Sequence, residues 1–200
     1  MGNFDTVIFD MDGTILDTLD DLTDSVNHVL KKHGYPCRTR DEVKNIVGNG
    51  VVNLLTRSLP EGEKANDFDA MLEEYLAHYK INMHNKTAPF PGVLALLKTL
   101  SENGCKIAVV SNKMDKAVRS LNQDYFGEYI KVAIGESKSV KRKPAPDSVL
   151  AALRELGASP GRAVYVGDSE VDIQTARNAG IESVGVTWGF RDRSVLEEAG

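Results

Sequence analysis

The strongest constraint on the fold is a single apolar strand at the start of the chain, followed by about seventy residues without any strand pattern. Residues 6–9 form a short β-branched and aromatic run that stops at an acidic turn containing Gly13. Residues 17–86 then show no strand signal, and their helical segments are separated by loops at 48–50 and 60–62. Helices are predicted at residues 18–33, 41–47, 51–59 and 65–83. The sequence therefore predicts an all-helical block inserted after the first strand.

The pattern changes after the turn at residues 89–92, Pro-Phe-Pro-Gly. Apolar strands are predicted at 106–110, 131–134, 163–166 and 183–187, and helices at 93–100, 116–121, 146–156, 171–179 and 194–199. Alternation of this kind indicates an α/β fold, with a Rossmann-like parallel sheet flanked by helices. Because the first strand belongs to this sheet, we expect an α/β core at 1–16 and 87–200 and a helical domain at 17–86.

Composition excludes several classes of protein. An apolar content of 42% is enough for a core, and a net charge of -5 gives no basic surface for nucleic acid or an anionic membrane. Cys37 and Cys105 are too few for a disulfide framework and are expected to be free thiols. The sequence has no basic leader and no apolar stretch of bilayer length. We expect a cytoplasmic protein, monomeric or homodimeric, with a small-molecule ligand.

Polar residues follow the predicted strands at their carboxyl ends. These residues are Asp10 and Asp12 after the first strand, Ser111 and Asn112 after the second, Lys143 after the third, and Asp168 and Asp172 after the fourth. Parallel strands bring these ends together in one crevice. Several carboxylates in one place repel each other unless a cation is bound, and oxygen ligands favour Mg²⁺. The sequence therefore predicts a magnesium site at this edge of the sheet.

Such a site suits phosphoryl transfer. An aspartate nucleophile splits hydrolysis into two steps, and a cation with a lysine offsets the repulsion between carboxylate and phosphate. A carboxyl group two residues further on can protonate the leaving oxygen and then deprotonate water. Gly13 lets the chain bend sharply, so that the backbone N–H groups after it can hold phosphate oxygens.

These segments resemble the four motifs of the haloacid dehalogenase superfamily, in order and each at its expected strand end. The branch they resemble most is the phosphoglycolate phosphatase-like group, in which a helical cap follows the first motif. The resemblance implies that Asp10 is the nucleophile and a metal ligand. It implies that Asp12 is the general acid and base and gives its backbone carbonyl to the metal, and that Asp168 is the third protein ligand.

The same resemblance assigns the substrate contacts. Thr14, Ser111 and Asn112 would bind the substrate, Ser111 holding the transferring phosphoryl group with the help of the Asn112 backbone. Lys143 would act in catalysis and binding by neutralising the nucleophile and the phosphate. Asp172 would lie one layer further out and orient Lys143 or a water on the metal.

Other functions remain open at this point. A phosphomutase of the same superfamily would use the same core residues, and a non-enzymatic regulator phosphorylated on aspartate belongs to another class. Asp12 argues against a dehalogenase, which would lack the second aspartate. Phosphoglycolate is the substrate the resemblance favours, but other small phosphomonoesters and pyrophosphate stay possible. Chains resembling this one usually continue through another short strand and helix after the helix at 194–199, so we expect either that the chain is truncated at Gly200 or that its final sheet edge differs.

Overall fold

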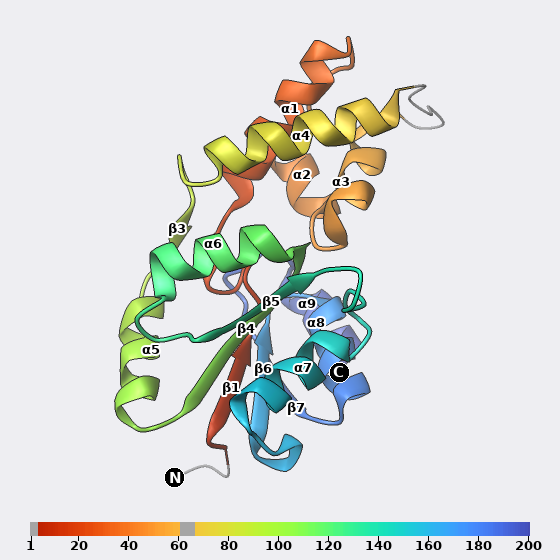
Figure 1. Ribbon diagram of the computed structural model, residues 1–200. Coiled ribbons are helices and arrows are strands. Elements are labelled where there is room, and N and C mark those ends of the chain that lie inside the picture. Colours follow the sequence, from red (N-terminus) through yellow and green to blue (C-terminus); the bar gives the residue numbers. More distant parts are fainter. Residues whose placement is uncertain (1–3, 61–66) are drawn as a thin grey trace. The chain divides into compact units, whose positions relative to one another are not determined.

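The computed structural model describes residues 4–60 and 67–200. It divides the chain into two compact units, one formed by Met1–Leu16 with Pro89–Gly200 and the other by Asp17–Ala88. The first unit contains the sheet, and the second is helical (Figure 1).

A five-stranded parallel sheet forms the centre of the first unit, which confirms the predicted fold class. Its strands are β1 (Thr6–Phe9), β4 (Lys106–Met114), β5 (Val132–Glu136), β6 (Ala163–Gly167) and β7 (Glu182–Gly185). Their order is β5-β4-β1-β6-β7, and every pairing is parallel. All four residues of β1 are buried, as expected for a central strand covered on both faces.

Helices cover both faces of this sheet. They are α5 (Val93–Glu102), α6 (Asp115–Phe126), α7 (Asp147–Leu156), α8 (Glu170–Ala179) and α9 (Arg193–Ala199), with a short 3₁₀ turn at Pro160–Arg162. Crossovers between parallel strands are right-handed. The chain moves outward through α5 and α6 and then returns past β1 through α7 and α8, so the two pairs lie on opposite faces. Ile8, Val110 and Ile134 pack with Val149 of α7 and Ala176 of α8 in one apolar cluster.

The strand order reverses at β1. The chain adds β4 and β5 on one side of β1 and then β6 and β7 on the other. In sheets of this type, ligands bind beyond the carboxyl ends of the strands at such a reversal. Asp10 is the first residue after β1, so it lies at this point.

The strand β4 is longer than the sequence predicted. Its pairing with β5 is regular up to Val110, and the register then shifts before Met114. Ser111 and Asn112 therefore lie within the strand rather than after it. A bulge of this kind redirects side chains at the end of a strand.

The second unit consists of α1 (Leu19–Lys32), α2 (Arg40–Ile46), α3 (Gly50–Ser58) and α4 (Phe68–Asn82). The first two residues of the helix predicted at 65–83 lie outside the described residues. Tyr75 and Tyr79 of α4 are buried and stacked, with ring centroids 5.8 Å apart. The chain passes between the units in β2 (Leu16–Asp17) and β3 (Ala88–Pro89), which pair with each other. Within residues 4–60 and 67–200, none of the helices combines the length and apolar content that a membrane span needs.

Candidate active site

The loop after β1 holds the first acidic residue of the site. The N–H of Asp10 still donates to the carbonyl of Val166 at 2.8 Å, so its backbone continues the sheet while its side chain lies beyond β1. The N–H groups of Ile15 and Leu16 then donate to the carbonyl of Met11, which closes a tight turn. Asp10 is 7% exposed. The turn fixes this carboxylate at the central position of the sheet edge.

Asp168 follows β6, the neighbour of β1. Its Oδ2 accepts the backbone N–H of Phe190 at 2.6 Å, and its Oδ1 accepts the hydroxyl of Thr14 at 3.2 Å. A Cβ atom on Gly13, whose φ is 86°, would collide with this carboxylate, and so would one on Gly189. The two glycines therefore let the chain approach Asp168 closely from both sides.

A network of three buried side chains surrounds the ammonium group of Lys143. Its Nζ donates to Asp10 Oδ1 at 2.7 Å, to Asp172 Oδ1 at 2.7 Å and to the hydroxyl of Tyr165 at 3.0 Å. Tyr165 donates in turn to Asp172 Oδ1 at 3.1 Å. Asp172 Oδ2 accepts the N–H and the hydroxyl of Ser169, at 3.0 and 2.6 Å. Both oxygens of Asp172 are thus engaged in holding neighbouring groups.

Asn112 fixes the backbone of Lys143. The side-chain oxygen of Asn112 accepts the Lys143 N–H at 2.6 Å, and its amide donates to the Lys143 carbonyl at 3.0 Å. Both residues are 4% exposed. This exchange connects the end of β4 to the loop after β5 and sets the direction from which Lys143 enters the site.

Asp12 lies in a separate set of contacts at the same edge. Its Oδ2 accepts the hydroxyl of Ser111 at 3.3 Å, and its Oδ1 lies 3.1 Å from Nζ of Lys113. The Lys113 N–H donates to the Ser111 hydroxyl oxygen at 3.1 Å. The carboxylate of Asp12 is therefore held by β4, whereas Asp10 and Asp172 share Lys143.

Burial and crowding raise the pKa of the central carboxyl groups. Burial, reinforced by the negative charge of Asp172, raises the pKa of Asp10 well above its usual value, and Lys143 opposes this in part. Burial and Asp172 also raise the pKa of Asp168 to about 7. Burial acts to lower the pKa of Lys143, but Asp10 and Asp172 outweigh it and raise that pKa. The ammonium therefore stays protonated while the carboxylates around it repel each other.

The donor set fits a hard divalent cation. Asp10, Asp168 and Asp172 each offer a carboxylate oxygen, and these three oxygens lie within 4.8 Å of one another. Three ionised carboxylates outweigh the single charge of Lys143, and a divalent ion would balance the excess. Oxygen ligands of this kind suit Mg²⁺. Asp172 accepts four hydrogen bonds, from Lys143, from Tyr165 and twice from Ser169. Asp10 and Asp168 accept fewer side-chain and backbone donors, so they are the better candidates for direct ligands.

Two residues of the site lie outside the set that sequence reasoning singled out. Tyr165 is fully buried in β6, and its position in the middle of an apolar strand is typical of a core residue. Lys113 at the end of β4 has a side chain that is 8% exposed. Lysine at a strand end usually lies in solvent. The only sequence signal for Lys113 is its position next to Ser111–Asn112. The only signal for Tyr165 is its position two residues before Gly167.

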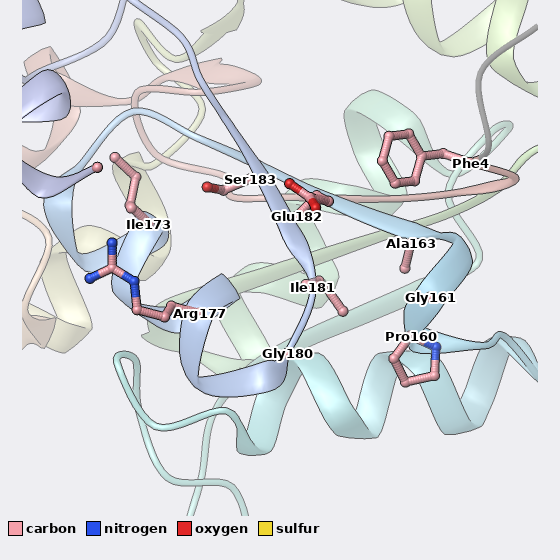
Figure 2. Close-up of a pocket in the computed structure, with 11 residues that line it drawn as sticks. Phe4, Pro160, Gly161, Ala163, Ile173, Arg177, Gly180, Ile181, Glu182 and Ser183 are labelled. Carbon is pink, nitrogen blue, oxygen red and sulfur yellow. The ribbon is translucent and has the colours of Figure 1, made fainter.

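A cavity of about 410 Å³ lies elsewhere in the first unit. Its lining includes Phe4, Pro160, Arg177 and Glu182, as Figure 2 shows. Phe4 precedes β1, Pro160 precedes β6 and Glu182 begins β7, so the cavity is at the amino ends of the strands. It is therefore remote from the carboxyl ends, where the acidic residues gather.

Comparison with known proteins identifies the class of α/β enzyme that has this fold and this acidic edge. A family model described as haloacid dehalogenase-like hydrolase matches residues 7–186. This match covers most of the chain, and the protein belongs to this family.

The relatives and solved structures narrow the class. A phosphoglycolate phosphatase of Agrobacterium fabrum is 34% identical, over 95% of this chain and 83% of the relative. One from Pseudomonas putida is also 34% identical, over 92% of this chain and 70% of the relative. A crystal structure from Lactobacillus delbrueckii, of a candidate phosphoglycolate phosphatase, has a TM-score of 0.93 and 38% identity, covering 98% of this chain and 92% of that one. These similarities place the chain among the phosphatases, hydrolases of phosphoric monoesters.

Proposed function

We propose that this protein is a Mg²⁺-dependent phosphatase that hydrolyses small phosphomonoesters through a phosphorylated Asp10. The observation that carries the proposal is the position of Asp10, which lies at the reversal of the strand order and shares the ammonium of Lys143 with Asp172. Because the relatives are phosphoglycolate phosphatases, 2-phosphoglycolate is the first substrate to test.

In this proposal Asp10, Asp168 and the backbone carbonyl of Asp12 hold Mg²⁺. The ion supplies Lewis-acid stabilisation of the charge on the phosphate oxygens. The excess negative charge of the buried carboxylates supports this assignment, as does the oxygen chemistry of the set. Asp172 orients Lys143, because its Oδ1 accepts a hydrogen bond from the Lys143 ammonium at 2.7 Å.

The reaction then proceeds in two steps, formation of an acyl phosphate on Asp10 and its hydrolysis. A carboxylate oxygen of Asp10 attacks phosphorus, the bond from phosphorus to the ester oxygen breaks, and Asp12 gives a proton to the departing alcohol. Water next attacks phosphorus of the acyl phosphate, Asp12 takes a proton from that water, and inorganic phosphate leaves with Asp10 restored. Lys143 offsets the charge on Asp10 and on the phosphate in both steps. Ser111 and the N–H of Asn112 are proposed to hold phosphate oxygens.

We assign the roles of cap and core to the two units. The helical unit, predicted at 17–86 and compact over Asp17–Ala88, would act as a cap that excludes bulk water during formation of the acyl phosphate. Cys37 and Cys105 are free, which suits the reducing, cytoplasmic setting that we propose for this enzyme.

The test is an assay of phosphate release from a panel of phosphate esters and pyrophosphate, with Mg²⁺ and with a chelator, alongside Asp10→Asn. We expect chelation to abolish activity and Asp10→Asn to lower kcat on the order of 10³-fold or more, since it removes the nucleophile. Asp69→Asn, on the exposed face of α4, is the matched control and should retain activity.

Three outcomes would contradict the proposal. Turnover without a divalent metal, or an active Asp10→Asn enzyme, would refute the mechanism. Phosphate release that needs a bisphosphate activator would favour a phosphomutase. Stable phosphorylation of Asp10 without turnover would favour a regulator.

A further inference from the structure

Lys113 is a nearly buried cation that the proposed mechanism does not use. Its side chain is 8% exposed, and its Nζ lies 3.1 Å from Oδ1 of Asp12, whose side chain is 14% exposed. Lysine is rarely this buried unless its ammonium is paired. The pairing with Asp12 therefore places a largely desolvated cation beside this carboxylate at the end of β4.

The ammonium of Lys113 faces a different part of the site from that of Lys143. Lys143 contacts Asp10 and Asp172, on the side where the phosphoryl group is proposed to be transferred. Lys113 contacts Asp12, the residue proposed to protonate the leaving oxygen. The two lysines thus divide the edge of the sheet into a phosphoryl side and a leaving-group side.

The position of Lys113 is fixed by its own strand. Its N–H donates to the Ser111 hydroxyl oxygen, and this hydroxyl in turn donates to the other oxygen of Asp12. These bonds connect Ser111, Lys113 and Asp12 to one another. A cation held in this way is preorganised, so little conformational entropy is lost when it binds a ligand.

We propose that Lys113 determines substrate specificity by binding a negative charge on the leaving alcohol. The substrates it favours are small phosphomonoesters whose alcohol carries a carboxylate on the carbon next to the ester oxygen. A carboxylate there gains a charge-assisted hydrogen bond in a largely desolvated place, which a neutral alcohol cannot provide. This inference rests on the proposed function, because it needs Asp12 to face the leaving oxygen.

Arg38 of the helical unit is less suited to this role. The guanidinium of Arg38 donates to the carbonyl groups of Ser58 and Leu59, and it pairs with Glu42 at 3.2 Å. These contacts commit Arg38 to the ends of α2 and α3. Lys113 instead presents its charge beside a proposed catalytic residue of the same unit.

The test compares two substrates of similar size, 2-phosphoglycolate and 2-hydroxyethyl phosphate, which differ in the charge of the leaving alcohol. The values of kcat/KM are measured with Mg²⁺ for the wild type, Lys113→Met, Lys113→Gln and Lys113→Arg. We expect both neutral variants to lose on the order of 10- to 100-fold more kcat/KM on 2-phosphoglycolate than on the neutral ester, as expected for a lost hydrogen bond between charged groups. Lys113→Arg should keep most of the discrimination because it retains the charge.

Lys98→Met is the matched control, since Lys98 is an exposed lysine of α5 whose side chain is 62% exposed. It should leave both kcat/KM values unchanged. An equal loss on the two substrates in Lys113→Met and Lys113→Gln would overturn the inference and reduce Lys113 to a positioning residue for Asp12.

The wild type separates failure of the inference from failure of the proposed function. If it hydrolyses both esters in a metal-dependent manner without preferring the carboxylate, the inference fails and the proposed function stands. If it hydrolyses neither these esters nor any other phosphomonoester, both fail.

Discussion

Tyr165 is the residue whose removal best tests the network around Lys143. Its hydroxyl accepts from Lys143 at 3.0 Å and donates to Asp172 at 3.1 Å, in a fully buried position. Tyr165→Phe keeps the ring and removes both bonds. We expect a loss of about 1–2 kcal/mol in the free energy of unfolding, because buried groups are left with one partner fewer. We also expect kcat/KM to fall about tenfold, since Lys143 is less firmly directed at Asp10.

The matched control for Tyr165→Phe is Tyr129→Phe, which removes a hydroxyl from a half-exposed ring in the turn before β5. Urea denaturation and steady-state kinetics of the two variants provide the measurement. If Tyr165→Phe matched the control in both quantities, the hydroxyl would have no part in holding Lys143.

Individual residues differ in how well the sequence predicts their surroundings. Asp10 and Asp168 directly follow apolar strands, so their types and positions are conspicuous. Lys143 lies in a basic loop after β5, and only the resemblance singles it out. Tyr165 and Lys113 are not, because a phenol within a strand is typical of the core and a lysine at a strand end is typical of the surface. The proximity of Lys113 to Asp12 depends on side-chain direction after the register shift in β4, and a linear pattern does not contain that direction.

At the scale of elements, Asp21 joins α1 to the segment that precedes β3. Its carboxylate is 1% exposed and accepts the N–H groups of Lys86 and Thr87, at 3.0 and 2.9 Å, and the hydroxyl of Thr87 at 2.8 Å. Asp21→Asn replaces one accepting oxygen by an NH₂ group that faces backbone donors. We expect it to destabilise the helical unit by about 2–3 kcal/mol, the range for buried bonds to a charged group.

Asp20→Asn provides the control for this prediction, because Asp20 is the preceding residue and its side chain is 47% exposed. Unfolding is followed by circular dichroism in urea, which reports the helices. A midpoint for Asp21→Asn no lower than that of Asp20→Asn would show that this carboxylate does not anchor the segment.

Periodicity predicted the helices and the strands of the five-stranded sheet, but it did not predict the two-residue strands β2 and β3, and it placed the ends of the elements less well. The predicted helices at 41–47 and 51–59 correspond to α2 and α3, each shifted by one residue. The helix predicted at 116–121 corresponds to α6, which continues to Phe126 because Val118, Leu121 and Phe126 are buried on one face. The ends depend on tertiary packing and on the bulge in β4, and both lie outside the information in a short window.

At the scale of the molecule, the strand order explains how distant residues meet. Asp10 and Lys143 come from two loops and Asp172 from the first turn of α8, yet a parallel sheet with its reversal at β1 brings these segments to one edge. The sequence could predict that edge because alternating strands and helices imply it. It could not predict that Asp12 and Lys113 form a pair apart from the central carboxylates, since this depends on packing distances.

The stability of the whole molecule should depend on pH and Mg²⁺ together. Burial and the charge of Asp172 raise the pKa of Asp168 from its ordinary value of 3.8 to about 7 in the folded, metal-free protein. Between these values the folded state binds more protons than the unfolded state, so the free energy of unfolding falls as pH rises. The slope is about 1.4 kcal/mol per pH unit and halves at the folded pKa, so Asp168 alone would cost about 1.5 kcal/mol between pH 5.5 and 7. Mg²⁺ favours the ionised carboxylate and should therefore stabilise the protein more at pH 7.5 than at pH 5.5.

Thermal melts with Mg²⁺ and with chelator at both pH values measure this effect of Mg²⁺ on stability. In Asp168→Asn, the dependence of stability on pH and its dependence on Mg²⁺ should both become weaker. A Mg²⁺ effect equal at the two pH values, or unchanged in Asp168→Asn, would mean that the ion does not bind at this carboxylate.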